Sequence, residues 1–232
     1  GWQDNSKYGS SSNMEFSDDG MIFITSSRDD LESFDGRYSG EGIPVARTGG
    51  LHYDGKWNND KESINTNYKI GSLGVTGTKN TRTQNTLPGN VINSSSDQEF
   101  DNYAFRQKID GVYEIKLDTT SSLKVSVEGT LKHNETQSNY QARSERGNGV
   151  LLNTSDRDLN NDIDETIFKA TAFWNKRMKK KGRSISLNIT EAINRSDAKG
   201  FLRSDNNFFD SEGLPDSTSL IDQYKLSKTR SS

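Results

Sequence analysis

A run of acidic and amide side chains from Asp156 to Glu165 contains the residue types that could most directly do chemistry. Ca²⁺ takes several oxygen ligands at alternating positions of a loop. A twelve-residue calcium loop begun at Asp156 would need glycine sixth and glutamate twelfth, where this chain has Asn161 and Ile167. A register two residues later fails in the same way. The sequence therefore favours a solvated acidic loop without an assigned metal ligand, and leaves calcium binding by residues 153–165 open.

The most basic stretch is Lys176–Arg183, with the sequence KRMKKKGR. Clusters of this kind can bind nucleic acid. Here the cluster separates two segments with strand-like alternation, where the chain needs a turn, and the whole chain carries a net charge of −3. We therefore expect a turn that stays in water and can meet lipid phosphates, and we expect no nucleic-acid partner.

Two histidines, His52 and His133, and no cysteine are present. Each histidine stands at a polar position or at the end of an expected strand, without a carboxylate at ligand spacing. We therefore expect solvated histidines rather than metal ligands or general bases. Neither a Gly-rich phosphate loop nor a nucleophile elbow occurs. The sequence predicts no enzyme, no cofactor, and no catalytic, cofactor-binding or metal residue.

The element that organises these side chains is a long hairpin with arms at 102–117 and 123–137. Side chains of a strand point to opposite faces with period two. Both arms alternate apolar with charged residues, so the hairpin has one apolar and one charged face. Each arm has about 15 residues, beyond the usual strand of about 5–6 and enough for the roughly 9–11 that cross a bilayer.

The same alternation predicts further strands along the chain. The expected strands are 43–57, 62–77, 102–117, 123–137, 165–177 and 183–195, with a last one starting near 219–228. The connections are expected to alternate between short turns and long polar loops, the long ones at 78–101, 138–162 and 195–216. Residues 1–42 are predicted to be irregular, with one helical turn over 29–36.

These strands are expected to pair as sequential antiparallel neighbours in an open, curved sheet, because hairpin connections leave no crossover. The last strand should pair only with 183–195. One face should carry Leu117, Ile115, Tyr113, Leu123, Val125 and Val127, and the other Lys116, Glu114, Lys124 and Glu128. The apolar six should be exposed if they face lipid, and buried if a second sheet covers them.

The composition bears on the fold class. Only 29% of the residues are hydrophobic, which is little for the core of a globule, whereas a membrane barrel needs only every second strand residue to be apolar. No apolar run approaches the roughly 18 residues of a membrane helix. We predict an all-β antiparallel meander of long strands, part of a transmembrane outer-membrane β-barrel, with Trp57 and Trp174 near the short turns as interfacial aromatics. The alternatives are a soluble, secreted all-β module that binds carbohydrate or another surface ligand, and a β-rich enzyme domain.

Several segments carry a family likeness. GLHYDGKWNND, FWNKRMKKKGRSISLNI and FLRSDNNFFDSEG resemble the barrel of TonB-dependent-receptor-like outer-membrane proteins of the Bacteroidetes type. The resemblance implies an N-terminal carboxypeptidase-regulatory-like domain, a plug and a barrel of about 22 strands. Because the chain resembles only a middle portion and starts at Gly1 without a signal peptide, we expect residues 1–232 to be one partial barrel domain without a plug.

The resemblance also implies a function. The parent protein would bind or take up a nutrient at the surface of a Gram-negative cell, in its outer membrane. Its partners would be outer-membrane lipid, the rest of the barrel and plug, and the TonB system through N-terminal parts. No binding or energy-coupling residue can be placed from the likeness.

Overall fold

The computed structural model describes residues 14–16, 22–24, 41–87, 90–180 and 182–231. In these residues the chain is all-β, in one seven-stranded sheet and one two-stranded sheet, without helices. Accordingly, none of the described segments is a helix long and apolar enough to cross a membrane.

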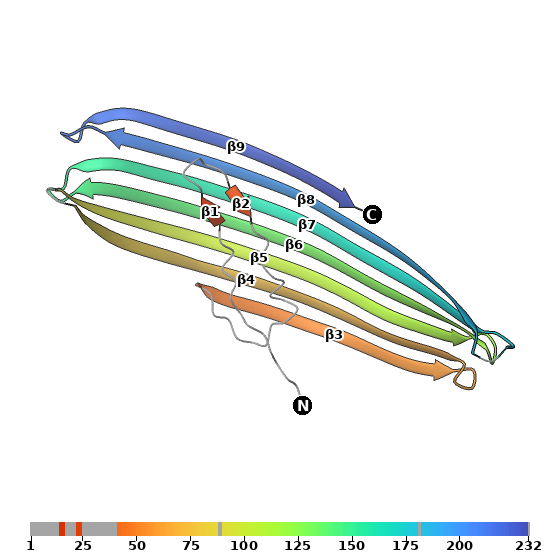
Figure 1. Ribbon diagram of the computed structural model, residues 1–232. Coiled ribbons are helices and arrows are strands. Elements are labelled where there is room, and N and C mark those ends of the chain that lie inside the picture. Colours follow the sequence, from red (N-terminus) through yellow and green to blue (C-terminus); the bar gives the residue numbers. More distant parts are fainter. Residues whose placement is uncertain (1–13, 17–21, 25–40, 88–89, 181, 232) are drawn as a thin grey trace.

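The seven strands follow one another through the sheet in sequence order, each antiparallel to the next (Figure 1). This confirms the expected open meander, with β3 at one edge and β9 at the other. The strands are β3 Ile43–Trp57, β4 Glu62–Leu87, β5 Asn90–Lys116, β6 Ser121–Arg146, β7 Leu151–Arg177, β8 Ser184–Phe209 and β9 Pro215–Ser231.

The long polar loops expected at 78–101, 138–162 and 195–216 were wrong. β4 to β8 run through these segments, so that each has 26 or 27 residues. The physical reason is that polar side chains meet in register across the strands. Gln98 Nε2 donates to Ser138 Oγ at 2.9 Å, and the Ser94 and Ser144 hydroxyls lie 3.0 Å apart. Backbone pairing thus continues where apolar alternation has ended.

All the connections in the sheet are consequently short, at 58–61, 88–89, 117–120, 147–150, 178–183 and 210–214. Left-handed backbone makes several of them possible. Asn58, Asn59 and Asp60 have φ of 55°, 55° and 59°, and Gly149 and Gly213 each have φ of 84°. Asparagine, aspartate and glycine tolerate this conformation best. The predicted alternation of short and long connections does not occur.

The two edges of the sheet are unequal. β3 pairs with residues 62–76 of β4, which leaves 77–87 without a strand partner on that side among the described residues. β9 pairs with β8 as expected, but along 194–209 rather than 183–195. The expectation failed because it treated 195–216 as a loop, whereas β8 continues to Phe209 and turns back there.

A second small sheet lies in the segment predicted to be irregular. β1, Met14–Phe16, pairs with β2, Ile22–Ile24, placing Met14 opposite Ile24. This corrects the irregular assignment for those residues. The helical turn expected over 29–36 falls outside the described residues.

The register fixes which side chains share a face of the large sheet. Leu123 lies opposite Ile115 and Trp174, and Val125 opposite Tyr113 and Ala172. We call this side the Leu123 face. The opposite side carries Lys124, Glu114 and their partners and is called the Lys124 face. The predicted division of the hairpin between two faces is confirmed by this register, because a slip of one residue would have inverted it.

The sheet also divides along its strands. The proximal half lies toward the reversals at 58–61, 117–120 and 178–183 and comprises 49–57, 62–70, 107–116, 121–131, 166–177 and 184–195. The distal half comprises the remainder of β3 to β8 and nearly all of β9. Among the residues whose burial the structure describes, the buried apolar side chains lie in the distal half, on the Lys124 face, and are Leu73, Val75, Leu159 and Leu202.

Candidate functional site

An exposed band of apolar side chains covers the Leu123 face of the proximal half. Leu51 is 77% exposed, Ile109 51% and Val127 36%. Other large exposed members are Tyr53, Trp57, Ile70, Leu131, Phe168, Ile185, Leu187 and Ile189. Of the six residues singled out for this face, none is buried: Leu117 and Val127 are exposed, and Tyr113, Ile115, Leu123 and Val125 are half-buried. The test proposed for a sandwich, burial of these residues under a second sheet, is therefore not met.

The Lys124 face of the same half is charged and hydrogen-bonded. Lys124 Nζ lies 2.9 Å from Glu114, and Lys108 Nζ lies 3.2 Å from Glu128. Asn67 donates to Asp110 at 2.7 Å. Val112, Ile167 and Phe173 are apolar exceptions on this face. One side of the proximal half thus suits an apolar environment and the other suits water.

Aromatic side chains gather at the turn end of the apolar band. The rings of Trp57 and Tyr113 stack with centroids 6.2 Å apart. Trp57 Nε1 and the Tyr113 hydroxyl both donate to Glu62 at 2.8 Å. Two amphipathic rings share one carboxylate and turn their polar atoms toward the strand end, the arrangement expected where an apolar phase meets water.

The distal half of the Leu123 face is acidic along β7, while exposed apolar side chains such as Val45 and Tyr224 continue on the same face along β3 and β9. The predicted acidic loop from Asp156 to Glu165 is part of β7, which corrects the loop assignment. Strand alternation places Asp156, Asp158, Asp162 and Asp164 on the Leu123 face. Because carboxylates two residues apart on a strand all point one way, the run cannot curl around one ion as a calcium loop does.

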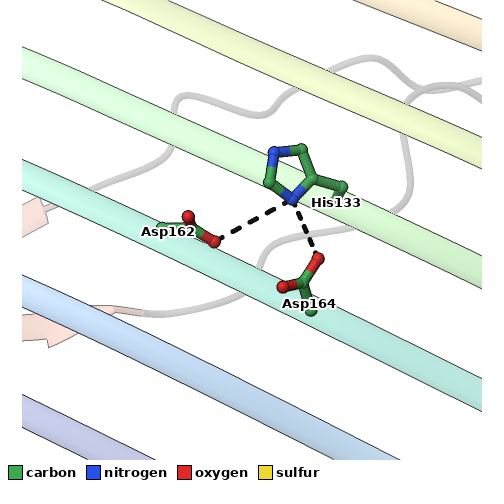
Figure 2. Close-up of side chains that lie close together, drawn as sticks. All are labelled: His133, Asp162 and Asp164. Carbon is green, nitrogen blue, oxygen red and sulfur yellow. Dashed lines mark hydrogen bonds and ion pairs between the residues drawn. The ribbon is translucent and has the colours of Figure 1, made fainter.

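One cluster on this acidic surface includes a histidine. His133 of β6 lies directly opposite Asp164 of β7, and Glu135 lies opposite Asp162. His133 Nδ1 is 2.9 Å from Asp164 Oδ1 and 3.9 Å from Asp162 Oδ1, and its Nε2 is 3.3 Å from Glu135 Oε1. Figure 2 shows both aspartates pointing toward the same ring nitrogen. Ligand atoms of His133, Asp162 and Asp164 all lie within 4.8 Å of one another.

The electrostatics of this cluster favour a charged imidazole. The hydrogen bond to Asp164 raises the pKa of His133; the bond to Glu135 adds to this effect, and partial burial opposes it. The sequence analysis found no carboxylate at ligand spacing from His133, and in this it was wrong, although the imidazole remains partly exposed to solvent. The missing information is the register, because Asp162 and Asp164 are distant in sequence and meet His133 only across the β6–β7 hairpin.

The other residues considered from sequence do not converge on a site. His52 lies on the Lys124 face of edge strand β3, where its Nδ1 is 2.7 Å from Asn67 Oδ1, an amide rather than a carboxylate. The basic cluster forms the end of β7 and the connection at 178–183, where Met178 N donates to the Arg183 carbonyl at 2.9 Å. The predicted turn at this position is confirmed.

Comparison with other proteins gives no family assignment. No protein-family model matches the chain, and no curated protein matches it either. The likeness to TonB-dependent-receptor-like barrels therefore stays a prediction. What the chain defines by itself is a class of fold, a single antiparallel meander with two chemically distinct faces.

Proposed function

We propose that the chain forms part of the wall of an outer-membrane β-barrel, with the Leu123 face of its proximal half against lipid. The observation that carries the proposal is the exposed apolar band on that face. About nine to twelve residues of each strand lie in the proximal half, which at about 3.4 Å per residue gives roughly 30–40 Å along the strand. A tilted strand of that length spans the roughly 25 Å apolar belt of a membrane barrel.

The opposite face supports the same proposal. Barrel strands alternate lipid-facing apolar residues with polar residues that line a wet interior. The Lys124–Glu114 and Lys108–Glu128 ion pairs are of that interior kind. The stacked Trp57 and Tyr113 would stand at the membrane boundary near the 58–61 turn.

The distal half would then extend out of the membrane as sheet. Residues 71–87 of β4 alone cover roughly 50 Å when extended. We place this half on the outside of the cell, because the parts of outer-membrane barrels that extend far beyond the membrane are extracellular, whereas their periplasmic turns are short. The strand edges of β3 and β9 would pair with further strands of the parent barrel, because unpaired edges are templates for such pairing.

We further propose that the parent is a receptor or transporter of the TonB-dependent-receptor-like type, which binds or takes up a nutrient. The support is the resemblance of sequence segments, together with a meander open at both edges as a piece of a larger barrel would be. Its partners would be outer-membrane lipid, the remaining barrel and plug, and the TonB system through other parts of the parent protein.

The experiment that tests membrane insertion uses the two band tryptophans. The chain is folded with vesicles that contain lipids brominated at different acyl depths. Fluorescence quenching is compared for Trp57→Phe and Trp174→Phe, each combined with Trp2→Phe so that one tryptophan remains. Trp57 and Trp174 should both be quenched, most strongly by bromines near the interface. A monomeric chain with a sharp cooperative melt in detergent-free buffer and unquenched tryptophans would overturn the proposal in favour of a secreted binding module.

A further inference from the structure

The cluster of His133, Glu135, Asp162 and Asp164 differs from the other acidic positions of the sheet in containing a nitrogen ligand. Asp158, two rows away on the same face, accepts a hydrogen bond from Asn139 Nδ2 at 2.7 Å and has no imidazole near it. Within the described ranges, no other group of three histidine or acidic side chains brings its ligand atoms so close together. The cluster is therefore the place on this acidic surface where, among the described residues, an imidazole nitrogen and carboxylates bring their ligand atoms together.

We propose that this cluster binds a divalent first-row transition-metal ion such as Zn²⁺, through His133 Nδ1 and one carboxylate oxygen each from Asp162 and Asp164. In tetrahedral zinc sites the metal–ligand bonds are about 2.0–2.2 Å, which places neighbouring ligand atoms roughly 3.4 Å apart. The two distances from Nδ1, 2.9 Å and 3.9 Å, fall on either side of that value. Small rotations of the two carboxylates, of which Asp164 is exposed and Asp162 half-buried, would equalise these distances.

Glu135 acts as a positioning residue in this site. Its carboxylate lies 3.3 Å from Nε2 and can accept the proton of that nitrogen. A histidine that donates one ring N–H to a carboxylate presents the lone pair of its other nitrogen to a metal, as most metal-bound histidines do. Here that other nitrogen is Nδ1, which faces Asp162 and Asp164 (Figure 2).

Charge and ligand type select the class of ion. Three carboxylates surround one imidazole, so a divalent cation would relieve the repulsion between them. On the neighbouring strand β8, Lys199 lies opposite Asp162 and Asp197 lies opposite Asp164. The Asp197 carboxylate is paired with Arg195, whose Nη2 is 2.7 Å away. A nitrogen ligand favours zinc and similar metals over Ca²⁺ and Mg²⁺, which prefer oxygen alone. Three protein ligands leave a position for water or for a ligand group.

The test is a zinc titration of the full chain in its strand-rich state, verified by circular dichroism, with a competing chromophoric chelator. We expect one ion per chain. His133→Asn should weaken Zn²⁺ binding more than about 100-fold, and Glu135→Gln about 10-fold, the range for residues that orient a ligand. X-ray absorption of the bound zinc should show one imidazole and a remainder of oxygen ligands.

Two matched controls separate the site from general charge effects. His52→Asn removes the other histidine, and Asp158→Asn removes the same charge from the same face of β7 as Asp164→Asn does. Both controls should leave zinc affinity within about twofold, whereas Asp164→Asn should lower it at least about 10-fold. The proposal is overturned if the strand-rich chain binds no zinc, if His133→Asn binds like the unchanged chain, or if either control loses as much affinity as its counterpart.

Discussion

The proximal and distal halves of the sheet belong to one continuous ladder of backbone hydrogen bonds but carry different side chains on their faces. In the proximal half the Leu123 face is apolar and exposed, as at Leu51 and Ile109. In the distal half the same face carries aspartates, as at Asp158 and Asp164. The pairing of β4 with β5, and of β7 with β8, continues from one half to the other without a register shift. Backbone pairing therefore does not require an apolar face, and only the presence of an apolar face can be recognised in the sequence as hydrophobic alternation.

The two halves also stabilise the ladder by different means. Distal strands join through neutral polar pairs, such as Ser155 Oγ, which donates to Asn206 Oδ1 at 2.6 Å. A hydrogen bond of this kind contributes a net 0.5–1.5 kcal/mol or so. In the proximal half the corresponding stabilisation would come from lipid around the apolar band, about 25 cal/mol for each Å² removed from water.

The largest expected effect is on amide hydrogen exchange in the distal half, where paired strands and loops would exchange at very different rates. Amides of 94–101 and 138–144 should exchange at least about 10³-fold more slowly than unstructured amides, because opening them requires breaking a continuous sheet. The measurement is exchange of the folded chain, followed residue by residue. Loop-like exchange in these segments beside protected proximal amides would contradict the long strands.

A charge on the Leu123 face should affect the two halves very differently. Val127→Arg, in the middle of the apolar band, should lower the free energy of unfolding in lipid by about 2–4 kcal/mol. Gln141→Arg places the same charge on the same face and strand in the distal half, where we expect a change within about 0.5 kcal/mol. Equal effects in vesicle-based denaturation would show that the two halves share one environment.

Glycines at a turn and within a strand should respond with opposite sign to alanine. Gly149, with φ of 84°, has no atom near its missing Cβ, so Gly149→Ala should cost about 1–2 kcal/mol through backbone conformation alone. Gly74, inside β4, has ordinary strand conformation and its nearest contact at 4.0 Å. Gly74→Ala should gain about 0.4–1 kcal/mol by restricting the unfolded chain. Denaturant midpoints measure both, and a costless Gly149→Ala would argue against the tight distal turn.

The smallest expected effect concerns pH and the turns that close each end of the sheet. Hydrogen bonds from Thr120 lower the pKa of Asp118, and backbone N–H groups of Leu214 and Glu212 lower that of Asp210. Because both pKa values are lower in the folded chain, the stabilisation is present above the unfolded value of about 3.9 and is lost as pH falls through the folded value.

Unfolding of the Asp118→Asn and Asp210→Asn variants between pH 5 and 2 measures this contribution. Each variant should show a shallower loss of stability than the unchanged chain over that range, Asp118→Asn reporting on the proximal end and Asp210→Asn on the distal end. Parallel pH profiles for all three chains would show that the turn carboxylates are not linked to folding.

The sequence predicted those strands in which apolar and polar residues alternate. β3 was predicted at its observed bounds, and the faces of Val125 and Lys124 follow from parity alone. The continuation of β4 beyond Gly77 was missed because a strand with polar residues on both faces has the composition of a loop. Its partners become evident only when Arg82 is placed beside Asp97, 3.2 Å away across the hairpin.

The histidine cluster could not be predicted for a related reason. His133 and Asp164 are opposite each other because the chain reverses at 147–150 and, beyond a register shift between Ser144 and Glu145, β6 and β7 keep one register. The triplet Gly147-Asn148-Gly149 is a hairpin signal that could have provided this register. Counting back from that turn along the two strands brings Asp162 and Asp164 to His133, provided that the segment is first recognised as strand and the register shift beside Ser144 and Glu145 is included.

The strict sequence order of the meander has a kinetic consequence. Each strand from β4 to β9 pairs with the strand made just before it, across a connection of a few residues. Closing such short connections costs little chain entropy, and the cost does not grow as strands are added. The sheet can therefore be assembled one hairpin at a time, each new strand docking on the edge left by its predecessor and offering the next edge in turn.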